Sequence, residues 1–333
     1  MPKAISLFSG AGGLDIGLQM AGIETVASVE LDKHCANTLR NNTKSSIFEG
    51  DVRSFDPRAV LNAVGLAEID LLHGGPPCQP FSQIGARKGL DHKDGLLLFE
   101  MIRWVSELRP RSFIIEQVKG LMKHGTAFEQ LQIDLKALGY AIDWKILNSV
   151  DFDVAQKRER VFIVGSRDGT VNLQNWFQEQ IASKTVGSVI ADLPSPETEI
   201  VPNHFDKTPA RDRERISYVK EGEWLSKSIA PKDIVNKLTK KDTTKFRRLS
   251  RELPSLTLRC GEIFYHPLQN RYLTPREYMR IHGYPDKHIL SGPIRGRTGQ
   301  VTNLDQHRQI ANSVPPPLAK AVGQAVLENI LCR

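Results

Sequence analysis

The stretch that decides the fold class is Ala4-Ile-Ser-Leu-Phe-Ser-Gly-Ala-Gly-Gly-Leu-Asp-Ile-Gly17, a short apolar run followed by a glycine-rich turn. The apolar residues predict a buried strand, and the glycines predict a tight turn that opens a helix at about Leu14. In an open α/β sheet, a turn at the carboxyl end of a strand is the usual place for a ligand. The stretch therefore predicts a strand–loop–helix unit with a ligand site at its loop.

The same alternation of short apolar runs and amphipathic stretches continues through the first half of the chain. It predicts an α/β fold with a doubly wound, mostly parallel sheet of seven strands. The expected strands are Ala4–Phe8, Thr25–Glu30, Ile47–Gly50, Ile69–His73, Ser112–Glu116, Tyr140–Leu147 and Arg160–Val164. The expected helices begin at about Leu14 or cover Asp32–Asn41, Gly95–Leu108, Phe128–Leu138 and the run after Pro315-Pro-Pro317.

The chain has 333 residues, which corresponds to about two domains of ~150 residues each. From about Thr170 the periodic pattern fades and prolines interrupt it. We therefore expect a first domain over residues 1–185, completed by the C-terminal segment 305–333. A second, smaller domain is expected over residues 186–304.

Composition excludes several classes of protein. Apolar residues make up 40% and charged residues 25%, which is typical of a globular chain and not of a disordered one. No apolar run approaches the ~18 residues of a membrane span, and the first one is too short for a signal peptide. The four cysteines are scattered without a Cys-x-x-Cys pair, which argues against a disulfide framework and against a zinc site. We expect a cytoplasmic protein without a metal.

The positive charge is concentrated in one segment. Lys and Arg number 45 against 38 Asp and Glu, a net charge of +7. The segment Lys227–Ser255 alone holds nine basic and three acidic residues and so carries +6 of it. Such a run is either a solvated surface or a surface that faces the phosphates of a nucleic acid, and both interpretations stay open.

The glycine-rich loop favours an adenosyl ligand over a dinucleotide. A dinucleotide fingerprint would place its third glycine at position 15, where Asp15 stands. An adenosyl group without a pyrophosphate needs less phosphate contact. Glu30, at the end of the second expected strand, could accept both ribose hydroxyls, and Asp51, after the third, could bind the adenine amino group.

A candidate nucleophile follows the fourth expected strand. Gly74-Gly-Pro-Pro-Cys-Gln-Pro-Phe-Ser82 contains Cys78 between prolines that restrict the backbone. A free cysteine is most often a small buried side chain, but these polar neighbours argue against a core position. Its thiolate would be the reactive form. The polar, glycine-bearing stretch that continues to Gly95 predicts a mobile lid.

Three further charged residues are expected near Cys78. Glu116 ends the fifth strand, and the fourth and fifth strands should end at the same edge of the sheet. Gln156-Lys-Arg-Glu-Arg160 precedes another apolar strand and would deliver Arg158 and Arg160 to that edge as a candidate anion clamp. A charge cluster of this kind is otherwise an ordinary solvated turn.

These residues occur in a recognisable order. Over nearly its whole length the chain resembles the DNA (cytosine-5) methyltransferases of the bacterial restriction-modification type. The motifs that carry the resemblance are Phe8–Gly13, Pro76-Pro-Cys-Gln-Pro-Phe-Ser82, Glu116-Gln-Val118, Gln156-Lys-Arg-Glu-Arg160, Arg271-Tyr-Leu-Thr-Pro-Arg-Glu277 and Gln309-Ile-Ala-Asn-Ser-Val314.

The resemblance implies a role for each catalytic candidate. The Cys78 thiolate would add to carbon 6 of cytosine, so that carbon 5 can take a methyl group. Glu116 would hold ring nitrogen 3 and the exocyclic amine. Arg160 would hold the base carbonyl oxygen, and Arg158 would orient the carboxylate or a phosphate. The cytosine would have to leave the DNA stack to reach Cys78.

The resemblance also implies S-adenosyl-L-methionine as cofactor and double-stranded DNA as substrate. A cognate restriction endonuclease is a possible partner, the chain is expected to act as a monomer, and residues 186–304 would be the target-recognition domain. The residues that match cofactor-lining positions are Phe8, Ala11, Gly13, Leu14, Glu30, Leu31, Asp51, Val52, Pro77, Leu97, Asn312, Ser313 and Val314.

One departure and three alternatives remain. The family's usual Glu-Asn-Val is Glu116-Gln-Val118 here, which puts any tight hydrogen bond of that asparagine in doubt. A transfer-RNA methyltransferase of the same fold is the first alternative, although the Cys-Phe-Thr element of those enzymes is absent. A silent DNA-binding relative would have lost Cys78, Glu116 or the arginines Arg158 and Arg160. A nicotinamide oxidoreductase would leave Cys78 without a role.

Overall fold

The structure is a computed structural model that describes residues 1–77, 97–123, 125–177, 184–197, 200–235, 246–294 and 303–332. Cys78 and the expected lid up to Gly95 lie outside the described residues, as do residues 236–245 of the basic segment. The chain forms two compact units. The first comprises Met1–Asn148, Glu159–Gln180 and Pro316–Arg333, and the second comprises Ser149–Arg158 and Ile181–Pro315.

The first unit is built on one mixed sheet, which confirms the predicted sheet of seven mostly parallel strands. The strands in the described residues are β1 (Lys3–Leu7), β2 (Glu24–Glu30), β3 (Ser46–Glu49), β4 (Leu71–Gly74), β5 (Ser112–Gln117), β6 (Ala141–Asn148) and β7 (Glu159–Ser166). They are ordered β3-β2-β1-β4-β5-β7-β6. The first five are parallel, and β7 lies antiparallel between β5 and β6.

The two faces of this sheet have different coverings. Alternate residues of the strands point to opposite faces, so Ile5 and Leu7 enter one large apolar core while Ser6 points the other way. Helices α3, α4 and α5 contribute Leu61, Trp104 and Leu131 to that core. The helices of this unit are α1 (Gly13–Met20), α2 (Lys33–Asn42), α3 (Pro57–Ala63), α4 (Leu97–Leu108), α5 (Gly125–Ala137), α6 (Leu173–Trp176) and α12 (Pro316–Val326).

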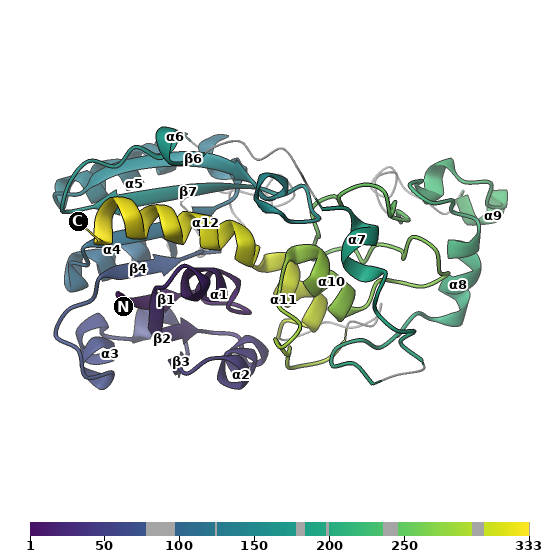
Figure 1. The fold of residues 1–333 in the computed structure, drawn as a ribbon, viewed down its shortest axis with the longest axis horizontal. Coiled ribbons are helices and arrows are strands. Elements are labelled where there is room, and N and C mark those ends of the chain that lie inside the picture. Colours follow the sequence, from purple (N-terminus) through teal and green to yellow (C-terminus); the bar gives the residue numbers. More distant parts are fainter. Residues whose placement is uncertain are drawn as a thin grey trace. The chain divides into compact units, whose positions relative to one another are not determined.

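On the other face, the C-terminal helix α12 returns to pack along α1, and Figure 1 shows the two side by side. Glycine makes this approach possible. A Cβ atom at Gly17 would lie 2.3 Å from the Cβ of Ala319 and 2.5 Å from the carbonyl oxygen of Pro316. A Cβ atom at Gly323 would likewise lie 2.8 Å from the side chain of Leu18. The ends of the chain are therefore joined by close helix packing.

The second unit contains short helices and irregular segments. Its described helices are α7 (Val186–Ile190), α8 (Ala210–Ser217), α9 (Lys232–Val235), α10 (Pro275–His282) and α11 (Gln306–Asn312). The expected C-terminal helical run is thus two helices, α11 in this unit and α12 in the first. Helix α11 ends at Asn312, and the prolines that begin at Pro315 separate it from α12.

Helix α10 shows how the motif Arg271-Tyr-Leu-Thr-Pro-Arg-Glu277 stabilises this unit. Thr274 and Glu277 form a reciprocal capping box at its first turn. Arg271 donates to both oxygens of Glu277, at 2.8 and 2.6 Å, and both side chains are buried. Burial alone would raise the pKa of Glu277, but the bonds and charge of Arg271 outweigh it and hold the pKa below its usual value.

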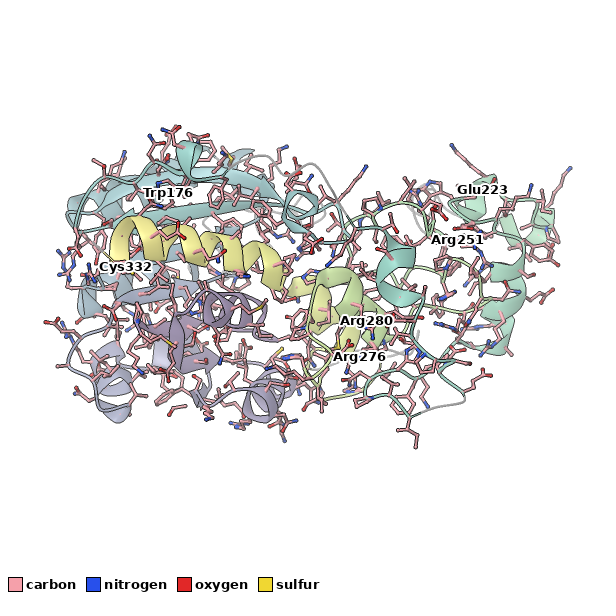
Figure 2. The ribbon with its side chains drawn as sticks, viewed as in Figure 1. Trp176, Glu223, Arg251, Arg276, Arg280 and Cys332 are labelled. Atoms are coloured by element: carbon pink, nitrogen blue, oxygen red, sulfur yellow. The ribbon has the colours of Figure 1, made fainter. Side chains whose placement is uncertain are left out.

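Arg276 of the same helix is fully buried, and its guanidinium binds backbone carbonyl oxygens of the neighbouring segments. Its guanidinium donates to the carbonyl oxygens of Pro202, Asp286 and His288 at 2.9 to 3.1 Å. Arg280, one turn later, pairs with Asp192 and Asp286 on the surface. Figure 2 labels both arginines on α10. The segments before and after α10 are thus tied to it by charge-assisted hydrogen bonds.

The packing divides the chain somewhat differently from the predicted domain bounds. Residues 305–315, assigned from the sequence to the first domain, pack with the second unit, and residues 149–158 do the same. The division of catalysis and target recognition between the units stays a prediction. Among the described helices, none combines the length and apolar character needed to cross a membrane.

Gly17→Ala tests the contact between α1 and α12. The new methyl group would meet the backbone of Pro316, which cannot move like a side chain end, so we expect the free energy of unfolding to fall by roughly 3 kcal/mol. Urea unfolding measures it. Gln19→Ala, on the exposed side of the same helix, should change stability by less than about 0.5 kcal/mol. Equal stability of the two variants would contradict the close contact.

Candidate active site

The candidate site lies where the order of the strands reverses. β1 pairs with β2 on one side and with β4 on the other, and β4 pairs in parallel with β5. Leu7 is opposite Gly74, and Gly74 is opposite Ile115. The loop after β1, the loop after β4 and the end of β5 therefore meet at one edge of the sheet. In open α/β sheets, ligands bind at this switch point.

The loop after β1 is held in a left-handed conformation. Phe8, Gly10 and Gly12 have φ angles of 55°, 55° and 78°. The amide N–H of Gly10 donates to Glu30 Oε2 at 2.6 Å, and that of Asp32 donates to Glu30 Oε1 at 2.7 Å. Glu30 thus joins the first loop to the end of β2.

The environment of Glu30 fits a ligand with two hydroxyl groups. Each carboxylate oxygen accepts one backbone N–H and keeps a lone pair for a further donor. Burial raises the pKa of Glu30 from 4.5 to about 7, and the two amide hydrogen bonds reduce the rise. The next side chain, Leu31, is 67% exposed and offers an apolar surface beside the carboxylate. These features fit the ribose and base of an adenosyl group.

Other predicted cofactor residues in the first unit lie near this edge. Ala11, Gly13 and Leu14 are buried at the start of α1, and Phe8 and Leu97 pack partly against the core. Asp51 follows β3 and caps the next turn, where its carboxylate pairs with Arg53. The ion pair with Arg53 lowers the pKa of Asp51. Because the pair is exposed to solvent, Asp51 can exchange Arg53 for another partner at little cost. Val52 is buried and Pro77 is exposed.

The predicted cofactor residues Asn312, Ser313 and Val314 belong to the second unit. Asn312 is exposed and accepts a hydrogen bond from the Cys260 thiol. Ser313 and Val314 are buried, and the Ser313 hydroxyl donates to the carbonyl oxygen of Ile310 at 2.8 Å. Within this unit they form the end of α11, and a role toward the cofactor stays a prediction.

Two predicted catalytic residues are in contact. Arg160 Nε lies 2.7 Å from Glu116 Oε1, and both side chains are about one-tenth exposed. Strand β5 provides Glu116, and the neighbouring β7 provides Arg160. Gly75 allows the carboxylate to approach the loop after β4, because a Cβ atom there would lie 2.8 Å from Glu116 Oε2. An acid and an arginine thus stand together one strand away from the loop that leads to Cys78.

The amide of Gln117 reaches this loop as well. Its Nε2 donates to the carbonyl oxygen of Pro76 at 2.7 Å, and the side chain is buried. The extra methylene relative to asparagine therefore does not prevent a short hydrogen bond to the backbone. Pro76 stands two residues before Cys78 in the sequence, so Gln117 fixes the start of that loop.

Arg158 binds the backbone at the end of α11. It is 1% exposed and belongs to the second unit, where its guanidinium donates to the carbonyl oxygens of Ala311 and Ser313 at 2.7 and 3.0 Å. A longer hydrogen bond of 3.4 Å joins its Nη1 to the carbonyl oxygen of Leu258. These hydrogen bonds hold the end of α11, and the role of Arg158 toward a carboxylate or phosphate stays a prediction.

Two contributors were missed from the sequence. Gly75 was seen only as part of a motif, although its lack of a side chain decides how close Glu116 can come. The carbonyl oxygen of Pro76 was not considered as an acceptor for Gln117. Neither has a sequence signal, because both depend on strands that the fold brings together.

Comparison with known proteins agrees with this geometry. The family model for C-5 cytosine-specific DNA methylase matches residues 2–328. The chain belongs to this family. This methylase is therefore an enzyme that methylates DNA cytosine at carbon 5. Type II methyltransferase M.Sau96I of Staphylococcus aureus is 36% identical over 96% of this chain and 74% of its own. Type II methyltransferase M.Eco47II of Escherichia coli is 33% identical over 97% and 78%.

Solved structures support the fold of the methylase. A protein encoded within an E. coli prophage has a TM-score of 0.77 at 24% identity and covers both chains fully. The Dnmt2 methyltransferase of S. pombe has a TM-score of 0.65 at 18% identity and covers 98% of this chain and 99% of its own. At these identities the likeness concerns the fold.

Gln117→Leu tests the hydrogen bond to Pro76. The buried carbonyl oxygen would lose its donor, so we expect stability to fall by about 1–3 kcal/mol and methyl transfer to slow about tenfold or more. Urea unfolding and steady-state kinetics measure the two effects. Gln174→Leu is the matched control, since that amide donates to the carbonyl oxygen of Trp144 on the surface. Similar effects in both variants would argue against a special role for Gln117.

The raised pKa of Glu30 predicts how stability depends on pH. Because the folded protein binds this proton more tightly than the unfolded chain, the free energy of unfolding should decrease as pH rises from 4.5 to 7. The contribution of Glu30 is roughly 3 kcal/mol for a shift of this size. Urea unfolding from pH 5 to 8 should show a smaller decrease in Glu30→Gln than in the wild type. The exposed Glu68→Gln should follow the wild type, and parallel curves for Glu30→Gln would refute the assignment.

Proposed function

We propose that this methylase transfers a methyl group from S-adenosyl-L-methionine to carbon 5 of a cytosine flipped out of double-stranded DNA, through a covalent bond to Cys78. The observation that carries the proposal is the contact between Glu116 and Arg160 beside the backbone of Gly75. An acid and a fixed cation at this edge can bind the polar rim of a cytosine ring. Cys78 stands three residues after Gly75 in the sequence.

In this proposal Cys78, Glu116 and Arg160 each have a separate role in the reaction. The thiolate of Cys78 forms a bond to carbon 6, and the electron pair of the 5,6 double bond becomes available at carbon 5. Glu116 holds ring nitrogen 3 and the exocyclic amine, while Arg160 holds the carbonyl oxygen on which negative charge develops. Carbon 5 would use this electron pair to bond to the methyl group, with S-adenosyl-L-homocysteine as the leaving product. Loss of the carbon 5 proton to water would then expel the thiolate and restore the 5,6 double bond.

The cofactor site is proposed at the loop after β1. When bound there, S-adenosyl-L-methionine supplies an electrophilic methyl group. Glu30 would accept the two ribose hydroxyls, Leu31 would contact the base, and Asp51 would exchange Arg53 for the adenine amino group. The left-handed backbone at Phe8 and Gly10 turns the loop tightly at the end of β1.

The DNA substrate explains the remaining features. A base within a duplex cannot reach a thiol at the edge of a sheet, so the target cytosine must leave the stack. The basic segment Lys227–Ser255 would contact phosphates, and the second unit would select the sequence. Since the relatives are type II methyltransferases, we also propose a restriction endonuclease of the same specificity as a functional partner.

Cys78→Ser tests the nucleophile. Bisulfite sequencing of DNA from a methylation-free host should show methylcytosine at one short motif with the wild type. The serine variant should lower the rate by a factor of about 1,000 or more, because a hydroxyl is a far weaker nucleophile than a thiolate. Cys332→Ser, at an exposed free cysteine, is the control and should stay active. Wild-type methylation by Cys78→Ser would refute the covalent mechanism, and no methylation by the wild type would point to RNA as substrate.

A further inference from the structure

The turn after β3 belongs to the donor site proposed above, and its backbone is tied to Glu30. Strands β2 and β3 pair in parallel with Glu30 opposite Glu49, and the amide N–H of Gly50 donates to the carbonyl oxygen of Glu30 at 2.9 Å. Asp51 follows directly and caps the short 3₁₀ helix η1 (Val52–Ser54). The acid proposed for the ribose and the acid proposed for the adenine therefore stand on one connected piece of backbone.

The hydrogen bonds within this turn are few. The amide N–H of Ser54 donates to the carbonyl oxygen of Asp51 at 2.9 Å, and that of Phe55 reaches the carbonyl oxygen of Val52 at 3.4 Å. Hydrogen bonds of a 3₁₀ helix are less well aligned than those of an α-helix. The Asp51 side chain is also about one-third exposed, so packing around it is incomplete. Contacts from another element are needed to fix the direction of its carboxylate.

Arg103 of α4 supplies such contacts. Its Nη2 donates to the carbonyl oxygen of Val52 at 2.9 Å, and its Nη1 donates to that of Phe55 at 3.2 Å. Glu100, one turn earlier on the same helix, accepts from Nε at 2.7 Å and so holds the guanidinium in place. All three nitrogens of one planar group are used, and two of them bind the turn. Lysine has a single nitrogen and lacks this fixed fork.

We propose that Arg103 is a positioning residue for the methyl donor, which fixes the backbone of residues 51–55 and with it the carboxylate that would receive the adenine amino group. This inference rests on the donor site proposed above. Arg103 contacts the backbone of the turn, whereas Arg53 contacts the Asp51 carboxylate and would give way to the donor. A turn that is already ordered loses less conformational freedom when the ligand binds, so its order increases affinity.

Arg111 offers a matched control in the same unit. It donates to the carbonyl oxygens of Leu331 and Ile330 at 3.1 and 3.2 Å, and its Nε pairs with Asp168 at 2.7 Å. Its side chain is 30% exposed, against 34% for Arg103. Arg111 stands directly before β5, at the opposite end of that strand from Glu116. The two arginines therefore make the same kinds of bonds, one at the proposed donor site and one away from it.

Arg103→Lys keeps the positive charge and removes the fork. Calorimetry on the DNA-free enzyme compares S-adenosyl-L-homocysteine with an analogue whose purine lacks the 6-amino group. We expect the dissociation constant of the adenosyl ligand to rise about tenfold and that of the analogue by less than about threefold, because only the first ligand uses the Asp51 carboxylate. Arg111→Lys should leave both constants within about twofold of the wild type. The turnover number of Arg103→Lys at saturating donor should also stay within about twofold, since an effect on binding alone raises KM.

Hydrogen exchange tests the contact without a ligand. The amides of Ser54 and Phe55 should exchange about tenfold faster in Arg103→Lys than in the wild type, because the turn opens more often when its carbonyl oxygens lose the guanidinium. In Arg111→Lys the same amides should exchange at the wild-type rate. Unchanged exchange in Arg103→Lys would show that the arginine does not hold the turn.

Asp51→Ala separates this inference from the donor site on which it rests. Loss of the preference for the amino group in both Asp51→Ala and Arg103→Lys, without a further loss in the double variant, is the expected result. Wild-type affinity for the adenosyl ligand in Asp51→Ala would show that the proposed donor site is wrong, and the inference with it. If Asp51→Ala loses the preference and Arg103→Lys keeps it, the inference alone is wrong. Equal losses for the two ligands in Arg103→Lys, with the same fall in urea stability as in Arg111→Lys, would show a merely structural role.

Discussion

The parallel pairing of β1 with β4 is the constraint on which the rest of the molecule depends. Its register sets Ser6 beside His73 and Leu7 beside Gly74, so the two loops that follow leave the sheet at the same edge. A slip of one residue would exchange the faces of every side chain on the strand and turn Ser6 into the apolar core. The glycine loop, the start of the Cys78 loop and Glu116 on the next strand have a common location only because this register is kept.

The buried carboxylates of the described residues differ in the groups that stabilise them. Glu116 and Glu277 each have an arginine partner, Arg160 in the first unit and Arg271 in the second. In the described part of the chain, Glu30 has amide donors instead and Asp15 faces hydroxyls. Burial therefore raises the pKa of these last two, and Glu30 accepts a hydrogen bond from the loop after β1. That loop is the part of the first unit whose order should respond to pH near neutrality.

The sequence predicted the strands well, because apolar runs of four to eight residues bounded by glycine and proline are strong local signals. It also grouped Glu116 and Arg160 correctly, since each stands at the end of a strand that reaches the same edge. The motif Gln156–Arg160 led us to expect Arg158 at the same edge as Arg160, and its role there stays a prediction. Strand β7 begins at Glu159, however, and Arg158 lies before it, where the chain belongs to the second unit and backbone carbonyls surround the guanidinium.

The sequence by itself determined the strand–loop–helix unit at the N-terminus, the α/β class of the fold and the family, because these depend on local pattern and ordered motifs. Only the tertiary structure decided that β7 lies antiparallel between β5 and β6, that α12 returns to pack against Gly17, and that Asp15 is buried. The physical reason is that pairing order and desolvation arise from contacts between residues far apart in the chain. No local pattern records how much water such a contact excludes.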